Sequence, residues 1–176
     1  DPVEFYFQGV NQVSIREEIK LDFPTVLRAF LRQDPDIILV GEMRDSATVD
    51  IAIKAALTGH LVFSTIHTND AASTVMRMVN MGVESFLIAD ALILVVAQRL
   101  VRRICKKCVE PHKVPPPALL EAGFSPEEAE TIQPFRGKGC GQCNNTGFKG
   151  RVGLYEVMDI TPDIRQLIMR RAQSVE

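Results

Sequence analysis

Four cysteines form the most specific chemical pattern in this sequence of 176 residues. Cys105 and Cys108 make one C-x-x-C pair, and after 31 intervening residues Cys140 and Cys143 make a second. Two such pairs can supply four thiolates to one tetrahedral zinc ion, although the gap is longer than the usual ~15–20 residues. Four thiolates leave no ligand position open, so we predict a structural rather than a catalytic zinc site. Reduced cysteines without metal, or a redox pair, are the alternatives.

The residues around the cysteines agree with a metal site. Three nearby glycines permit a tight turn that points backbone amides at the sulfurs: Gly139, Gly141 and Gly147. Four thiolates on one divalent cation leave a net charge of about −2, which neighbouring cations can offset. Those cations are Arg102, Arg103, Lys106 and Lys107.

Glu42 is the first candidate for a second kind of chemistry. It closes the apolar run 36–42, which reads as a strand. Ligands of open α/β sheets bind at the carboxyl ends of the strands, where nucleotide hydrolases place a carboxylate that holds magnesium or polarises water. The alternative is an acid that merely ends a strand.

Two of the three histidines, His60 and His67, bracket the next apolar strand, 61–66. They are either site residues beside Glu42 or packing and capping residues. A zinc site shared by these two is not expected, because residues seven apart on a strand lie roughly 23 Å apart.

No G-x-x-x-x-G-K-[ST] phosphate-binding loop occurs in the sequence. If the protein handles nucleotides, we expect that loop upstream of residue 1. The isolated chain would then be a poor enzyme.

The elements that must position these residues follow from periodicity and capping. An alternation of strand and helix predicts an α/β fold with a parallel sheet and right-handed crossovers. The continuous apolar character of 36–42 predicts a strand buried on both faces. The predicted elements are a strand at 10–15, a helix at 22–33 capped by Asp22, the strand 36–42, a helix at 46–58 capped by Ser46, the strand 61–66, and a helix from Asn69 or Asp70 to Met81.

The second half of the chain differs in character. A long apolar helix is expected at 84–103, followed by a turn-rich segment that holds all four cysteines and six of the eleven glycines. One or two short helices at 117–132, a strand at 151–158 and a helix at 162–172 complete the prediction. We therefore expect three parts: a core at 1–103, a tetracysteine element at 104–150, and a strand and helix at 151–176 that pack on the core.

Composition restricts the class of protein. Apolar residues make up 46% of the chain and the net charge is −2, which argues against a globally basic nucleic-acid binder and an acidic disordered chain. The most apolar stretch, 86–101, is interrupted by Asp90, Gln98 and Arg99, so a membrane-spanning helix is not expected. Paired cysteines without a secretory signal indicate a reducing compartment and hence a cytoplasmic protein.

Taken in order, these motifs resemble the ATPases of type II secretion and type IV pilus assembly. Residues 1–4 (DPVE) look like the end of that family's Asp box, 36–42 (DIILVGE) like its atypical Walker B motif, and 58–69 (TGHLVFSTIHTN) like its His box. Residues 98–105 (QRLVRRIC) lead into the zinc element, as in the assembly and secretion motors rather than the retraction motors. The resemblance covers nearly the whole chain.

The resemblance implies a truncated RecA-like P-loop ATPase core, with ATP and Mg²⁺ as ligands of the complete protein. It implies that Glu42 is the Walker B carboxylate, Glu4 an Asp-box acid near the attacking water, and His60 and His67 sensors of the γ-phosphate. It also implies a homo-hexameric motor, peripheral to the inner membrane, that works on a polytopic platform protein and powers pilus assembly or protein secretion.

Two other functions stay open at this point. The chain could be a non-enzymatic, zinc-stabilised interaction module that binds a partner through the basic segment 99–107. It could also bind nucleic acid, against which stand the net charge of −2 and an aromatic content of only 6%.

Overall fold

The computed structural model describes residues 3–170, and it folds as two compact units. The first combines the residues up to Ala97 with those from Glu156 onward, and the second is Gln98–Tyr155. The strands β3 (Leu94–Ile104) and β6 (Phe148–Asp159) pair with each other and belong in part to both units. The boundaries between units thus fall inside paired strands and not in a linker.

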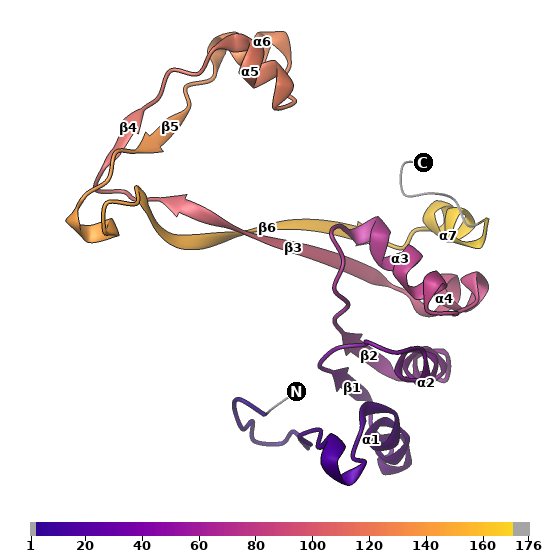
Figure 1. Cartoon of the computed structure of the whole chain (residues 1–176). Helices are drawn as coiled ribbons and strands as arrows, with labels where there is room; N and C mark the ends of the chain where they lie inside the picture. The colour runs from indigo at the N-terminus through magenta and orange to yellow at the C-terminus, as the bar shows by residue number, and fades with distance from the viewer. Residues whose placement is uncertain (1–2, 171–176) are drawn as a thin grey trace. The chain divides into compact units, whose positions relative to one another are not determined.

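A two-stranded parallel sheet lies at the centre of the first half of the chain (Figure 1). β1 (Ile37–Val40) pairs with β2 (Leu61–Ser64) in a register that runs from Ile37 opposite Leu61 to Val40 opposite Ser64. The helix between them is α2 (Ser46–Leu57), and α1 (Phe23–Phe30) precedes β1. The predicted strand–helix–strand order and the parallel pairing are confirmed.

Aspartates begin both helices. Asp22 accepts a hydrogen bond from the Thr25 amide at 2.8 Å, as predicted. Asp45 accepts one from the Thr48 amide at 2.8 Å, so α2 is capped one residue earlier than the predicted Ser46.

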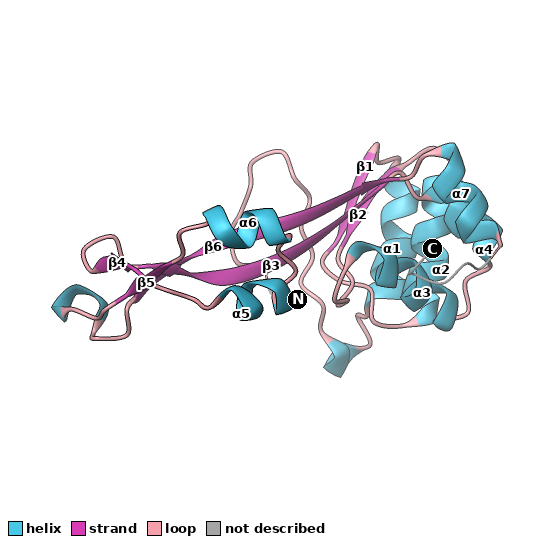
Figure 2. Ribbon diagram, turned by 90° about the horizontal axis from the view of Figure 1, so that it is seen from above, coloured by secondary structure: helices cyan, strands magenta, loops and turns pink. Residues whose placement is uncertain are grey.

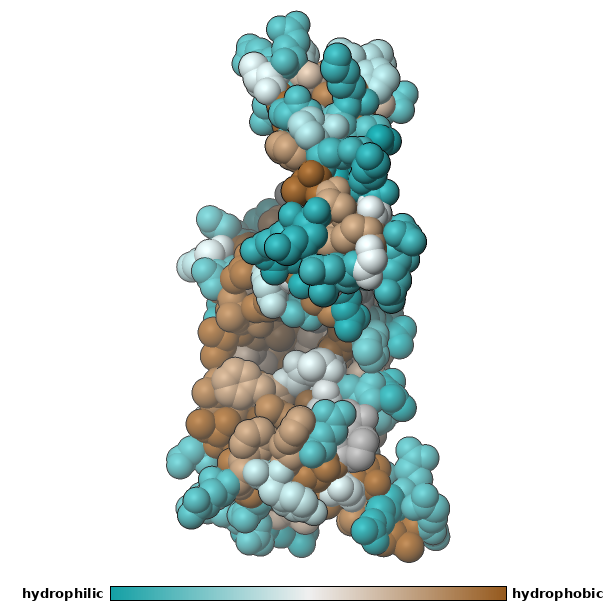
Figure 3. All heavy atoms as spheres, turned by 90° about the vertical axis from the view of Figure 1, so that its left-hand side faces the viewer, coloured by the Kyte–Doolittle hydropathy of each residue, from teal (hydrophilic) through white to brown (hydrophobic). Residues whose placement is uncertain are grey.

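The prediction that the strand at 36–42 is buried on both faces was wrong. Ile38 and Val40 are 3% and 5% exposed and pack with α1 and α2, whereas Ile37 and Leu39 are 61% and 72% exposed. Within the described residues, helices cover one face of this small sheet only. Apolar side chains, brown in Figure 3, gather on the surface that this view presents.

Three further helices complete the first unit: α3 (Ala71–Asn80), α4 (Ser85–Ala91) and α7 (Pro162–Met169). The helix α4 contacts α2, α3 and α7, which are drawn in cyan in Figure 2. Met78, Ile88 and Ile168 share one buried cluster with residues of α2 and β3, which ties the end of the chain to its middle. The predicted helices at 69–81 and 162–172 are confirmed within the described residues; residues 171–172 lie outside them.

The prediction of a long helix at 84–103 was wrong. The helix α4 ends at Ala91, and the next residues form the strand β3. Ile93 to Val96 and Val101 are mostly β-branched, and such side chains lose rotamer freedom in a helix but fit a pleated strand. β3 and β6 run in opposite directions as a long twisted ribbon (Figure 1).

The second unit has little apolar core. It contains the paired strands β4 (Val109–Pro111) and β5 (Phe135–Gly137) and the short helices α5 (Pro116–Glu121) and α6 (Pro126–Thr131). The predicted strand at 151–158 is part of β6, and two short helices are present where one or two were expected at 117–132. Ser125 begins α6 with a capping box to Glu128.

The strand predicted at 10–15 is absent from the structure. These residues are irregular, and the single bridge nearby joins Arg16 to Leu21 around the short 3₁₀ turn Glu17–Ile19. Among the described residues, no helix is both long and apolar enough to cross a membrane.

Candidate active site and candidate metal centre

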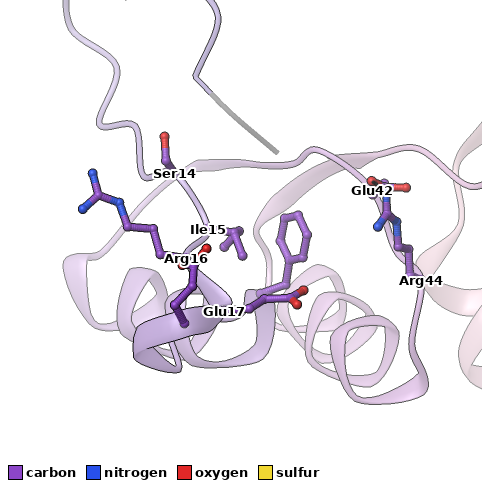
Figure 4. A pocket seen from close by; sticks show the side chains of 8 residues that line it. Ser14, Ile15, Arg16, Glu17, Glu42 and Arg44 are labelled. Atoms are coloured by element: carbon purple, nitrogen blue, oxygen red, sulfur yellow. Dashed lines mark ion pairs between the residues drawn. The ribbon is translucent and has the colours of Figure 1, made fainter.

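Glu42 lies just beyond β1, at the carboxyl edge of the parallel sheet. Glu42 is only 5% exposed although its side chain is a carboxylate. The oxygen Oε1 forms an ion pair with Nη2 of Arg44, which stands two residues further on with 72% of its side chain exposed (Figure 4). A buried acid is retained in folded proteins when a partner compensates its charge, and Arg44 provides this compensation.

The second oxygen of Glu42 faces His67. Oε2 lies 3.3 Å from Nε2 of the imidazole, and it is buried without a hydrogen bond from any of residues 3–170. A buried, incompletely satisfied carboxylate oxygen is unusual, and here it is directed at the same edge of the sheet as His67. This oxygen is available to a cation or a water molecule.

Two hydrogen bonds hold the loops after β1 and β2 together. The amide of Met43 donates to the carbonyl of Thr65 at 3.0 Å, and the Thr65 hydroxyl donates to the carbonyl of Gly41 at 2.7 Å. Because the strands are parallel, both loops leave the same edge, and these bonds bring Glu42 and His67 together. Glu42 and His67 therefore lie next to each other, as expected if both are site residues.

The charge state of Glu42 follows from Arg44. The hydrogen bond from the guanidinium lowers the pKa of Glu42 below its usual value, and its positive charge adds to this effect. Burial acts in the opposite direction and is outweighed. Glu42 is therefore ionised at neutral pH, as a metal-binding or water-orienting carboxylate must be.

An open pocket of about 390 Å³ adjoins Glu42 and Arg44. Its other lining residues come from the segment before α1 and from the start of that helix, as Figure 4 shows: Ser14, Ile15, Arg16, Glu17, Glu18 and Phe23. Both signs of charge line the pocket, so it fits a polar ligand better than an apolar one.

The remaining two candidates lie elsewhere. His60 is at the opposite end of β2, where its Nδ1 lies 3.0 Å from the carbonyl oxygen of Ala55 at the end of α2. Glu4 is exposed, and within residues 3–170 the ion-pair partners of Glu42 are Arg44 and His67, not Glu4. Asp1 and Pro2 of the same motif lie outside the described residues. The structure thus groups Glu42 with His67 and separates His60 from both.

The four cysteines of the second unit converge on one point. Their sulfur atoms all lie within 4.8 Å of one another. Sγ of Cys105 is 3.9 Å from that of Cys140, and Sγ of Cys143 is 3.9 Å from that of Cys108 and 3.7 Å from that of Cys140. Disulfide sulfurs are ~2.05 Å apart, whereas four thiolates ~2.3 Å from a central zinc ion are separated by ~3.8 Å. The donor set fits a tetrahedral zinc ion, as the sequence predicted.

Backbone amides support the sulfurs. The amide of Cys140 donates to Sγ of Cys143 at 3.2 Å, and although burial opposes it, this bond and one from Gly147 lower the Cys143 pKa to about 6. Burial raises the pKa of Cys108 to about 12, and the other three thiols add to this effect. Of these two thiols, Cys143 is the more readily ionised, and a divalent cation would favour the thiolate form of Cys108 as well.

A pair of glycine substitutions tests the turn at the cysteines. Gly147 has φ +77°, and a Cβ there would collide with the carbonyl oxygen of Gly137. Gly147→Ala should therefore lower zinc affinity about tenfold or more, in the range for disturbed supports of metal ligands. Gly141→Ala has open space around it and no positive φ, so it should bind zinc like the parent. Titration against a chromophoric zinc chelator measures both, and equal loss in the two variants would contradict this role of Gly147.

Two residues with contacts at or near the candidate site were not assigned from the sequence. The sequence analysis gave Arg44 no role, although its spacing of two from Glu42 could have indicated an ion pair. Glu156 contacts the start of α3, 85 residues away in the chain. No local pattern indicates such a contact.

Comparisons with known proteins agree with this geometry. The family model described as "Type II/IV secretion system protein" matches residues 1–176. The type IV pilus assembly ATPase PilB of Acinetobacter baylyi is 55% identical over all of this chain and 31% of its own length. The type II secretion system protein E of Pseudomonas aeruginosa is 41% identical over all of this chain and 35% of its length.

A solved structure, the pilus retraction motor PilT with bound ADP, is similar with a TM-score of 0.67 and 32% identity. The likeness covers 97% of this chain and 40% of that one. The chain thus spans about a third of the length of the curated relatives that it matches. From the match over its full length and the shared fold, this chain belongs to the type II/IV secretion system protein family, whose members include secretion and pilus ATPases.

Proposed function

We propose that this chain is part of a motor ATPase that hydrolyses ATP to power type IV pilus assembly or type II protein secretion. The observation that carries the proposal is the pair formed by Glu42 and His67 at the carboxyl edge of a parallel sheet, within a family of ATPases. The 55% identity to a pilus assembly ATPase favours that apparatus.

In this proposal Glu42 is the acidic residue of the Walker B motif. When bound, ATP would supply the phosphoryl group that is transferred, and Mg²⁺ would neutralise part of the charge of its phosphates. The buried Oε2 of Glu42 would hold the cation or orient the attacking water, and Arg44 keeps the carboxylate ionised. His67, with 89% of its side chain exposed, can turn toward a phosphate while it stays next to Glu42.

Glu4 and His60 remain predicted members of the site, as an Asp-box acid and a γ-phosphate sensor. The contact of His60 with the end of α2 supports a capping role equally well. The phosphate-binding loop is not part of this sequence. The activity belongs to the complete protein, and we expect the isolated chain to hydrolyse ATP poorly.

His67→Ala in the full-length protein tests the proposal. Its kcat for ATP hydrolysis should fall about tenfold or more, with KM changed less than threefold, because a group that acts on the transferred phosphate contributes mainly in the transition state. A steady-state assay of phosphate release at saturating Mg²⁺ measures both constants. His112→Ala, a change in the other unit, serves as the matched control.

A parent protein that released no phosphate from ATP would contradict the proposed function. Equal kcat values for the His67 and His112 variants would leave His67 as a surface residue. A comparable loss in His60→Ala would support the sensor role of that residue.

The remaining parts of the proposal concern the assembly. The complete protein would be a cytoplasmic homo-hexamer at the inner membrane that acts on a polytopic platform protein, without a nucleic-acid partner. The tetracysteine cluster would bind one structural Zn²⁺ through Cys105, Cys108, Cys140 and Cys143.

A zinc-stabilised interaction module is the second candidate function. The basic residues of segment 99–107 are exposed, and they favour this function for the second unit alone. The two functions are compatible, since a motor needs a surface that meets its partner.

A further inference from the structure

Glu156 joins two parts of the first unit that are distant in sequence. Its Oε2 accepts a hydrogen bond of 3.1 Å from the backbone amide of Ala71, the first residue of α3. Figure 1 shows the end of β6, which carries Glu156, beside α3. Ala71 follows His67 by four residues, so this contact is made directly after the loop of the candidate active site.

The side chain of Glu156 is exposed, but the residues that follow it on the same strand enter the core. Residues two apart on a strand lie on the same face, so Glu156 and Met158 share a face of β6. Ile160, the next residue at this spacing, directly follows the strand. Met158 packs against the main buried cluster, Ile160 is 7% exposed within it, and the Ile160 amide donates to the carbonyl of Ile93 at 3.0 Å. Ala71 is 0% exposed in the same cluster. The core thus holds Ala71 directly, and it holds the backbone of Glu156 through the residues that follow it.

The chemistry of the contact suits a carboxylate. The first amides of a helix lack partners within the helix, and their partial positive charge favours an anion. Asp70 accepts from the Ser73 amide at 2.7 Å, and Glu156 accepts from that of Ala71. Two acids from different elements therefore fix the start of α3.

The loop between His67 and α3 is tied to that helix end. The Thr68 hydroxyl donates to the carbonyl of Asp70 at 3.1 Å and lies 2.8 Å from the hydroxyl of Thr74. The His67 side chain is 89% exposed, so packing does not determine its place beside Glu42. The backbone of this loop must do so.

We propose that Glu156 is a positioning residue of the candidate active site: by holding the start of α3, it holds the His67 loop beside Glu42. This inference rests on the proposed ATP hydrolysis. Glu156 itself touches no reacting group in this proposal and acts through α3 and His67.

Three variants of the full-length protein test this role. Glu156→Ala removes the acceptor, Glu156→Gln keeps an acceptor oxygen without the charge, and Asp159→Ala changes an exposed acid on the same strand as a control. Glu156→Ala should lower kcat about tenfold with KM within about twofold, because small displacements of a catalytic group cost rate rather than binding. Glu156→Gln should recover most of this loss, and Asp159→Ala should match the parent.

Amide hydrogen exchange gives a readout that does not depend on activity. In Glu156→Ala, exchange should become faster in residues 67–72 and stay unchanged in β1 and β2. In the His67→Ala background, Glu156→Ala should lower kcat no further, because both changes would remove the same contribution.

Each result decides the question. Parent-like kcat, parent-like exchange at 67–72, or a full additional loss in the double variant would each overturn the positioning role. A parent protein without ATPase activity would contradict the proposed function instead, and the exchange measurement would still show whether Glu156 holds the loop.

Discussion

Glu42→Gln in the full-length protein should bind ATP with near-parental affinity and hydrolyse it about 100-fold more slowly or worse. Glutamine keeps the size of the side chain and loses the charge and the basicity that orient water or hold Mg²⁺. In this structure the change also removes the ion pair with Arg44 and places a neutral amide at the carboxyl edge of the sheet in place of the carboxylate. Nucleotide binding, which depends chiefly on the phosphate loop, should persist.

Asp36→Asn is the matched control for this substitution. Asp36 is an exposed acid at the other end of the same strand, so the acid-to-amide change there alters net charge equally without touching the site. Fluorescent-nucleotide titration and a phosphate-release assay separate binding from turnover. Parental turnover in Glu42→Gln would show that Glu42 only ends a strand. Loss of nucleotide binding would show that Glu42 contributes to binding ATP rather than to the hydrolysis step.

The sequence indicated the parallel core because its signals are local. Asp22 and Asp70 cap their helices, and the apolar runs before Gly41 and after His60 form the paired strands β1 and β2. The exposed outer face of β1 was not predictable in the same way. A run such as Ile37–Val40 reads as buried on both sides whether or not anything covers the second face.

The error at 84–103 has a different origin. Both a buried helix and a strand fit a continuous apolar run, and periodicity alone does not distinguish them. The β-branched residues after Leu92 were the signal that favoured a strand, and the pairing of β3 with β6, some fifty residues later, decided it. Non-local pairing of this kind is invisible to capping rules.

Some features of the candidate site could likewise be predicted from the sequence, and others could not. The grouping of Glu42 with His67 follows from parallel pairing, and the convergence of the four cysteines follows from their spacing. The separation of His60 from Glu42 follows from the same pairing, since the two residues stand at opposite ends of adjacent strands. Glu156 lies outside any such rule, because its partner is determined by how β6 packs on the core.

Removal of zinc should have the largest structural effect of any single change. Purified protein should contain about one zinc ion per chain, and Cys140→Ser should lose it and loosen residues 105–150. In the second unit only four apolar residues are buried, and two of these, Cys105 and Cys143, are ligands of the candidate site; the others are Leu119 and Ala129. So small a core cannot offset the conformational entropy of the unit, whereas structural zinc contributes on the order of 10 kcal/mol or more in small metal-dependent modules.

The first unit should survive this loss, since Val49, Met78 and Ile88 belong to a core of its own. Amide exchange after chelation should therefore rise across 105–150 and stay slow in β1 and β2. Gln142→Ser, an exposed change between two ligands, should keep both the zinc and the protection. If reduced, freshly purified protein held no zinc and residues 105–150 were nevertheless protected, the cysteines would be packing residues, and the sulfur distances near 3.8 Å would reflect close packing of thiols rather than a metal site.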